Sequence, residues 1–182
     1  ITNMEKDVAK VLISEEELKQ ICKRLGEQIT KDYQGKKLLV VSVLKGAVVF
    51  MADLLREIKC DCAIDFIAVS SYSGTKTTGV VKFKKDLDVD PDGMDILIVE
   101  DILDSGITLS YLSCVLMGRN ANSIKICTLL DKPANRKADI KADYVGQVVP
   151  DEFIIGYGLD YNEKYRNLPY IGILDESVYG GK

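Results

Sequence analysis

The sequence has 182 residues, of which 47% are hydrophobic and 29% are charged, and its formal net charge is −4. A chain of this length can bury a substantial core as one domain, without disulfides or structural metals. The acidic balance argues against broad nucleic-acid binding, and no apolar stretch approaches the ~20 residues that cross a bilayer.

Two further features of the composition limit the chemistry and the compartment. The chain has no histidine, so proton transfer near neutral pH must use a carboxylate, a lysine, a thiol or the substrate itself. The cysteines are odd in number and scattered, which indicates reduced, buried thiols in a cytoplasm. They are Cys22, Cys60, Cys62, Cys114 and Cys127. The start of the chain is polar and contains acids, unlike a signal peptide, and this also favours the cytoplasm.

Periodicity predicts an alternation of helices and strands. A capping box of Ser14 and Glu17 precedes one apolar helical face, and uninterrupted apolar runs mark strands covered on both sides. In chain order, the sequence predicts a helix over about 14–33, a strand over 38–44, a helix over about 47–58, a strand near 63–69, a strand over 96–99, a helix from Thr108 and a strand over 124–130. This α/β order predicts an open, mainly parallel twisted sheet flanked by helices.

Two other segments depart from this alternation. Segment 70–79 is rich in hydroxyl groups and lacks apolar periodicity, which predicts a mobile surface loop. From Ala142 onward the pattern changes to short strands around Pro150 and Pro169, which predicts a small lobe over the site. We therefore expect one domain over residues 1–182, with a core of about 36–141 and a hood formed by the N-terminal segment and about 142–182.

The most informative segment is an apolar run that continues directly into two adjacent acids, Glu100 and Asp101. Ligands of parallel sheets gather at the carboxyl ends of strands, so this strand would deliver charge to a ligand site. Gly106 permits a positive φ, and Ser105 and Thr108 provide hydroxyls before a helix whose free N–H groups form a phosphate cradle. The loop has no lysine and no G-x-x-x-x-G-K-[ST] spacing, unlike nucleotide triphosphatases. From the residues alone, a solvated acidic turn and a plain helix cap stay open.

Two patterns suggest metal sites but fit them poorly. The Asp-rich stretch 88–93 matches the opening of a calcium-binding loop, but its twelfth position is Val99 instead of glutamate. Cys60 and Cys62 would lie on one side of an extended chain, but Zn²⁺ needs about four ligands and no second pair exists. We expect neither site.

The segment from Ile96 to Leu109 resembles the phosphoribosyl-diphosphate motif of type I phosphoribosyltransferases, with apolar residues, two acids, a variable pair, Asp-Ser/Thr-Gly and a Thr. No residue departs from that pattern, and the resemblance implies the fold of that family. In the family, the acid pair holds the two ribose hydroxyls and the loop wraps the 5′-phosphate. The resemblance therefore assigns Glu100 and Asp101 to the ribose, Ser105, Gly106 and Thr108 to the phosphate, and leaves Asp104 at the mouth of the loop.

Two earlier segments extend the resemblance. Leu44-Lys45-Gly46 resembles the family's pyrophosphate loop, in which the peptide bond before the lysine is often cis. Ser71-Tyr72 resembles the start of the family's flexible lid over the reaction centre. Without the resemblance, the first is an ordinary strand-to-helix turn and the second is a loop with no role.

The distal part resembles the base-binding region of the 6-oxopurine, hypoxanthine-guanine branch, in residues 130–133 and 149–169. The resemblance implies that Lys132 donates to O6 of the purine and rejects a 6-amino group. It also implies that Phe153 stacks on the ring, that Ile154 presents backbone groups to it, that Asp160 binds a metal and that Arg166 contacts pyrophosphate. Taken singly, each residue also fits an ordinary surface, turn or core position, but their common order favours the resemblance.

The resemblance implies transfer of the 5-phosphoribosyl group from phosphoribosyl diphosphate to N9 of hypoxanthine or guanine. Asp104 would take the proton from N7 as N9 attacks. Since this displacement builds oxocarbenium-like charge on the ribose, carboxylates, Mg²⁺ and a dry pocket matter more than a nucleophile. Mg²⁺ is the expected cofactor, with Asp160 as a direct ligand and Glu100 and Asp101 as further candidates.

Several other functions share parts of this pattern. A regulator with the same fold that binds nucleic acid would need a basic face, which the acidic total does not supply. A phosphoribosyl-diphosphate synthetase would normally be longer, and transferases for adenine, orotate or uracil should lack the Lys132 and 153–166 arrangement. A response-regulator receiver has its acids after the first strand. The family suggests a homodimer or homotetramer, and the sequence leaves open the preference among hypoxanthine, guanine and xanthine.

Overall fold

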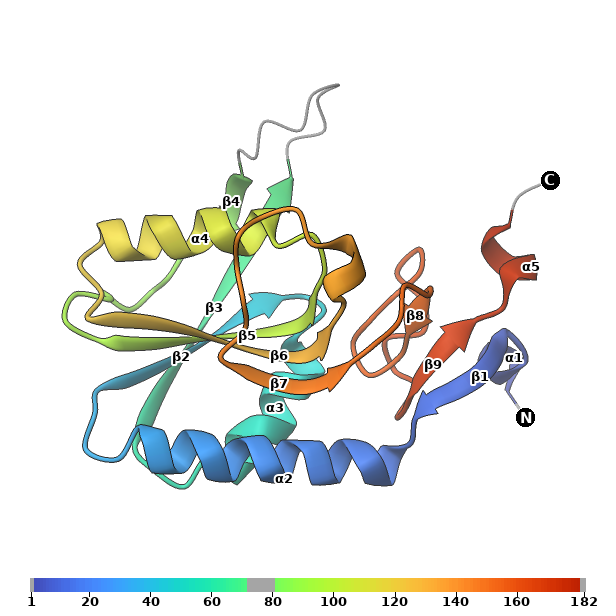
Figure 1. Ribbon diagram of the computed structural model, residues 1–182, viewed down its shortest axis with the longest axis horizontal. Helices are drawn as coiled ribbons and strands as arrows, with labels where there is room; N and C mark the ends of the chain where they lie inside the picture. Colours follow the sequence, from blue (N-terminus) through green and yellow to red (C-terminus); the bar gives the residue numbers. More distant parts are fainter. Residues whose placement is uncertain (1, 72–80, 181–182) are drawn as a thin grey trace.

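The computed structural model describes residues 2–71 and 81–180, which form two β-sheets with helices around them (Figure 1). The strands are β1 (Val8–Ile13), β2 (Leu38–Leu44), β3 (Cys62–Ser71), β4 (Val81–Lys85), β5 (Asp95–Leu103), β6 (Ser123–Asp131), β7 (Tyr144–Val148), β8 (Ile154–Ile155) and β9 (Ile171–Leu174). The helices are α1 (Asn3–Lys6), α2 (Glu15–Asp32), α3 (Val48–Glu57), α4 (Ile107–Gly118), the 3₁₀ helix η1 (Pro133–Asn135) and α5 (Glu176–Tyr179).

The large sheet has the strand order β4-β3-β2-β5-β6-β7, and all neighbouring pairs are parallel except β3 with β4. Helices α2 and α3 lie below this sheet in Figure 1, and α4 lies above it. Within β5, Leu97 and Val99 pack into the core on the α2 and α3 side, whereas Ile96 and Ile98 pack on the α4 side. A strand buried on both faces has no polar positions, which explains its uninterrupted apolar run.

The small sheet joins the two ends of the chain. Its order is β1-β9-β8 with antiparallel pairing, so the N-terminal strand lies beside a strand formed by Ile171–Leu174. Figure 1 shows this sheet at the end of the large sheet, with both termini near it. Strand β1 has only one fully buried residue, Ile13, and its other side chains are exposed or half-buried. It therefore carries little hydrophobic alternation, and the sequence did not predict it.

The predicted α/β alternation is confirmed in the large sheet. At the start of α2, the Ser14 hydroxyl accepts from the backbone N–H of Glu17 at 3.1 Å, and the Glu17 side chain returns to Ser14, so the capping box is present. Helix α4 begins one residue earlier than expected, after Gly106. The division into core and hood stays a prediction, and strand pairing adds β7 to the large sheet, beyond the expected limit near residue 141.

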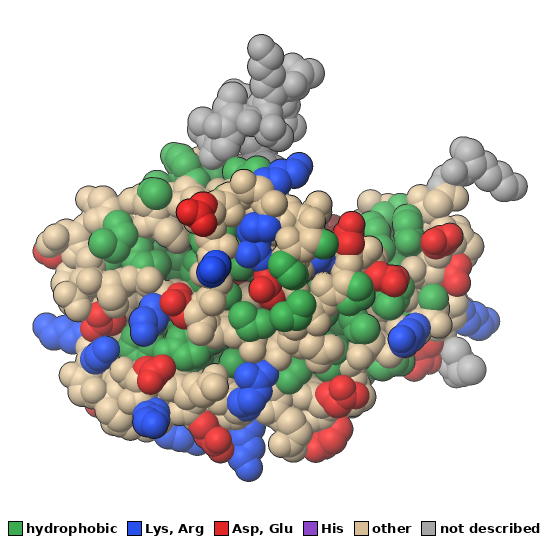
Figure 2. Space-filling view, in the orientation of Figure 1, with side chains coloured by type: hydrophobic (Ala, Val, Ile, Leu, Met, Phe, Trp, Pro, Cys, Tyr) green, Lys and Arg blue, Asp and Glu red, His purple; other side chains and the backbone are tan. Residues whose placement is uncertain are grey.

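The five cysteines are free thiols, as the sequence indicated. Cys22 and Cys127 are buried, but Cys114 is exposed on α4, so the expectation that every cysteine is buried was wrong. The face shown in Figure 2 has basic and acidic side chains interspersed, without a continuous basic patch. In the described part of the chain, no helix combines the length and the apolar character of a membrane span.

Candidate active site

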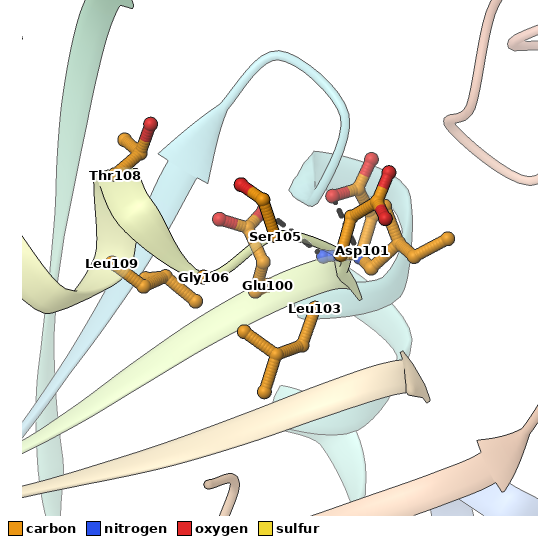
Figure 3. A pocket seen from close by; sticks show the side chains of 9 residues that line it. Glu100, Asp101, Leu103, Ser105, Gly106, Thr108 and Leu109 are labelled. Carbon is orange, nitrogen blue, oxygen red and sulfur yellow. Dashed lines mark hydrogen bonds between the residues drawn. The ribbon is translucent and has the colours of Figure 1, made fainter. Parts of the chain in front are cut away.

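The site is built where β5 leaves the core. Its first five residues are buried, and the strand then carries two half-buried carboxylates, Glu100 and Asp101. After the strand, Gly106 has φ +79°, and a Cβ there would lie 2.4 Å from the Ile140 side chain, so only glycine fits this turn into α4. Figure 3 shows the oxygen atoms of the two acids and of Ser105 on one side of the chain.

A cavity of about 240 Å³ opens over this turn. It is lined by Glu100, Asp101, Ile102, Leu103, Asp104, Ser105, Gly106, Thr108 and Leu109. All six residues that the sequence assigned to the ribose, the phosphate and the general base therefore line one cavity. The start of α4 adds the free N–H groups that a phosphate needs, and the nearby Ser105 hydroxyl accepts from the backbone N–H of Ile107 at 3.4 Å.

The two acids differ in their surroundings. Burial, and then the charge of Asp101 beside it, raises the pKa of the Glu100 carboxyl well above its usual range. Asp101 accepts from the backbone N–H of Ile102 at 2.8 Å. A partly desolvated carboxylate beside a second acid responds strongly to cations and hydroxyl donors, because less water screens its charge than at the surface. The pair is thus suited to bind a polar ligand that brings such groups.

Asp104 lies between two cavities. One of its carboxylate oxygens is buried and has no hydrogen-bond partner in the described part of the chain. Its backbone carbonyl accepts from Arg136 at 3.0 Å, which holds the loop in place. Arg136 also pairs with Asp131 at the end of β6. Arg136 was not predicted from the sequence, because its side chain bonds to backbone carbonyls that only the fold brings near it.

The second cavity has a volume of about 390 Å³. It is lined by Ile102, Asp104, Lys132, Asp151, Glu152, Phe153, Ile154, Leu159 and Tyr179. The predicted base-binding residues Lys132, Phe153 and Ile154 thus meet in one cavity, and Asp104 joins it to the first. The Lys132 ammonium donates to the carbonyl of Glu152 at 3.0 Å and is 3.7 Å from a carboxylate oxygen of Asp151.

Two aromatic side chains accompany Phe153. The Tyr179 ring stacks on it with centroids 4.7 Å apart, and the Tyr161 ring meets it edge to face at 5.3 Å. Neither tyrosine was predicted from the sequence. An aromatic residue near the end of the chain carries no local sign of its partner, so only the packing of α5 against residue 153 identifies it.

The predicted pyrophosphate residues lie beside these cavities and do not line them. The peptide bond between Leu44 and Lys45 is cis, as the resemblance suggested. Gly46 lies directly against the acid pair, since a Cβ there would be 2.0 Å from a carboxylate oxygen of Asp101. Arg166 donates to the carbonyl of Gly158 at 2.7 Å.

The remaining predicted residues are Asp160, Ser71 and Tyr72. The Asp160 carboxylate lies 3.4 Å from the Arg166 guanidinium and accepts from the backbone N–H of Glu163 at 2.9 Å. Ser71 is the last residue of β3, whereas Tyr72, and with it nearly all of the expected loop over 70–79, lies outside the described residues. Within residues 2–71 and 81–180, no three Asp, Glu or Cys side chains form a cluster that could hold a metal on its own.

Comparison with known proteins agrees with this geometry. Residues 12–162 match the family model of the phosphoribosyl transferase domain. A hypoxanthine-guanine phosphoribosyltransferase of Bacillus subtilis is 58% identical over 177 residues, covering 97% of this chain and 98% of that protein. One from Staphylococcus aureus is 54% identical over 177 residues, covering 97% and 99%. A crystal structure of a hypoxanthine phosphoribosyltransferase from Staphylococcus aureus superposes with a TM-score of 0.97 at 53% identity, covering 99% of this chain and 98% of that one. The chain belongs to the phosphoribosyltransferase family, in its hypoxanthine-guanine branch.

Proposed function

We propose that this chain moves the 5-phosphoribosyl group from phosphoribosyl diphosphate to N9 of hypoxanthine or guanine, giving IMP or GMP and pyrophosphate. The observation that best supports this is the place of Asp104, which lines both the cavity of the acid pair and the cavity of Lys132. Glycosyl transfer to a base requires the ribose and the base to meet at one point, with a proton acceptor there.

The first cavity would take the phosphoribosyl group. Glu100 and Asp101 would accept hydrogen bonds from the ribose hydroxyls, and Ser105, Gly106 and Thr108 would surround the 5′-phosphate at the start of α4. As the bond to pyrophosphate lengthens, positive charge grows on the ribose ring, and two carboxylates close to it stabilise that charge. The half-buried position of Glu100 limits the water that can screen its charge.

The second cavity would take the base. Lys132 would exchange its bond to the Glu152 carbonyl for one to O6 of the purine, Phe153 would stack on the ring, and backbone groups of Ile154 would meet its edge. The Asp104 oxygen that has no partner among the described residues would accept the proton from N7 as N9 attacks. A 6-amino group would face the Lys132 ammonium donor to donor, so adenine should be rejected.

Magnesium fits this set of donors. The chain offers carboxylate oxygens at Glu100, Asp101 and Asp160, and no three-residue cluster among the described residues. Mg²⁺ prefers oxygen ligands and usually keeps waters and substrate phosphates around it, so a few separate carboxylates suffice. When bound, Mg²⁺ neutralises charge on the leaving diphosphate. Asp160 would be its direct protein ligand, with Glu100 and Asp101 as further candidates.

Lys45, Gly46 and Arg166 would bind the leaving pyrophosphate, and Ser71 and Tyr72 would begin the lid.

The free thiols support a cytoplasmic location, and we expect a homodimer or homotetramer. Interspersed charges on the visible face do not favour a regulator that binds nucleic acid.

A spectrophotometric assay with phosphoribosyl diphosphate, Mg²⁺ and each of five nucleobases tests this function. Hypoxanthine and guanine should be converted, while adenine, uracil and orotate should not. Conversion of adenine at a rate comparable to that of hypoxanthine would overturn the 6-oxopurine assignment. Turnover that persists in excess chelator would overturn the role of the metal.

A further inference from the structure

Glu163 lies between the two cations that we assign to pyrophosphate. One of its carboxylate oxygens is 3.1 Å from the Lys45 ammonium, and the other is 3.3 Å from the Arg166 guanidinium. Lys45 follows β2 of the large sheet, whereas Arg166 lies far along the chain, between β8 and β9. One carboxylate thus connects two basic side chains from separate parts of the fold.

The backbone presents this carboxylate in a conformation that glycine would adopt more easily. Tyr161 and Lys164 exchange two backbone hydrogen bonds, at 3.1 and 3.0 Å, and so close a two-residue hairpin turn. Its central residues, Asn162 and Glu163, both have positive φ, 51° and 62°. Turns of this kind favour Asn-Gly, because a side chain at positive φ is strained. Local turn chemistry therefore does not explain a glutamate here, whereas its contacts with the two cations do.

We propose that Glu163 is a positioning residue that holds Lys45 and Arg166 ready for the leaving group and is displaced by pyrophosphate. This inference rests on the proposed function, which assigns these two cations to pyrophosphate. The carboxylate supplies in the free enzyme the negative charge that the diphosphate supplies in the complex. It keeps the exposed Lys45 side chain beside Arg166, which the Gly158 carbonyl and Asp160 also hold, before the substrate arrives.

The charges and the exposure make the exchange feasible. A glutamate carboxylate is ionised at neutral pH, so Glu163 meets Lys45 and Arg166 as an ion pair with each. The side chains of Glu163 and Lys45 are 63% and 68% exposed, and ion pairs this open to water are weak. A diphosphate carries more charge than one carboxylate and offers several oxygens, so it can replace Glu163 on both cations.

The test is calorimetric titration of the free enzyme with inorganic pyrophosphate and Mg²⁺. Glu163→Gln removes the charge but keeps the size, and Glu163→Gly removes the side chain while relieving the positive φ. Both variants should bind pyrophosphate about two- to five-fold more tightly than wild type, since Glu163 itself is exposed and its ion pairs with Lys45 and Arg166 contribute little. Glu27→Gln, which neutralises an exposed acid on α2, is the charge-matched control and should not change the affinity.

Two further measurements separate this inference from the proposed function. Lys45→Ala and Arg166→Ala should weaken pyrophosphate binding; if both bind like wild type, the assignment of these cations to pyrophosphate is wrong. If both weaken it while the Glu163 variants bind no more tightly than wild type, the displacement by pyrophosphate is wrong and the proposed function stands. The gain in affinity for pyrophosphate in Glu163→Gln should also become smaller at high salt. KM for hypoxanthine should be the same in Glu163→Gln and in wild type.

Discussion

Among single residues, Asp104 stands out because it lines two cavities and one of its buried carboxylate oxygens has no hydrogen-bond partner within residues 2–71 and 81–180. Asp104→Asn keeps the shape of the loop and loses the proton acceptor. We expect kcat to fall about 10²–10⁴-fold, as for the loss of a general base, with KM for both substrates nearly unchanged. Steady-state kinetics under conditions where chemistry limits turnover measures this. Asp139→Asn, at an exposed position, is the control.

Lys132 is predicted to decide the choice of base. Only 8% of this residue is exposed, so its ammonium is held at the second cavity and not in bulk water. Lys132→Ala should lower kcat/KM for hypoxanthine and guanine and reduce the ratio of these values to kcat/KM for adenine. A site that forms a hydrogen bond to one substrate can reject an analogue that cannot form it by a factor of about 10⁴ or more. Lys137→Ala, an exposed lysine nearby in sequence, should change neither. Undiminished discrimination in Lys132→Ala would mean that another group reads O6.

We predict that the ionised form of Glu100 destabilises the folded enzyme when no substrate is bound. Burial raises its pKa, so the folded state binds its proton more tightly than the unfolded state does. The contribution of Glu100 to the free energy of unfolding is therefore greatest at acid pH, and it is lost as pH rises through the raised pKa. Glu100→Gln should therefore raise Tm at pH 8 but not at pH 4, while kcat/KM for phosphoribosyl diphosphate falls. A gain of about 1 kcal/mol would appear as about 2–4 °C.

Thermal unfolding at several pH values measures this difference, with Glu27→Gln as the control on the solvent face of α2. A Tm gain of equal size at both pH values would show that the effect does not come from titration of Glu100. Wild-type kcat/KM in Glu100→Gln and Asp101→Asn would make the acid pair structural.

Among the elements, the loop after β2 lies in direct contact with the last residues of β5. Because a Cβ at Gly46 would lie 2.0 Å from the Asp101 carboxylate, Gly46→Ala must push that carboxylate aside. We expect kcat/KM for phosphoribosyl diphosphate to fall at least tenfold, with a smaller effect on KM for the base. Gly118→Ala at the end of α4, where the new Cβ meets open space, should leave the kinetics unchanged. Equal kinetics in both variants would contradict the close contact.

The elements also differ in how much their sequences reveal. Strands β2 and β5 are buried on both faces, so their apolar runs identify them. Strand β1 is short and mostly apolar, but Lys10 is its one polar residue, so it shows no alternation; it lies at the edge of the small sheet, pairs only with β9 and buries only Ile13 fully. Strand β4 was also not predicted from the sequence, although Val81 and Phe83 alternate there with lysines, as in a half-buried strand. It pairs antiparallel with β3 at the edge of the large sheet.

At the scale of the whole molecule, Tyr157 connects the segment after β8 to the helices below the large sheet. Its hydroxyl donates to the Asp53 carboxylate on α3 and lies 3.8 Å from the Cys22 sulfur on α2. Tyr157→Phe should lower the free energy of unfolding by about 1 kcal/mol, the net value of one hydrogen bond, because Asp53 is exposed and regains water. Urea denaturation measures this loss.

Tyr170→Phe is the matched control, since no hydrogen bond of the Tyr170 hydroxyl is present within residues 2–71 and 81–180. Its stability should equal that of wild type. If Tyr157→Phe is as stable as wild type, the link from Tyr157 to Asp53 contributes nothing to holding the two parts together.

From local patterns alone, the sequence predicted the α/β alternation and the apolar run that leads into Glu100 and Asp101, because periodicity and turn chemistry act over a few neighbouring residues. It also identified candidate residues at each part of the site through motifs that are local in the chain. Only the folded chain shows that Asp104 lines two cavities, that Arg136 holds its loop, that Tyr179 stacks on Phe153 and that Glu163 lies between Lys45 and Arg166. These contacts join residues from different elements, and their distances depend on how the sheets and loops pack, which no local pattern encodes.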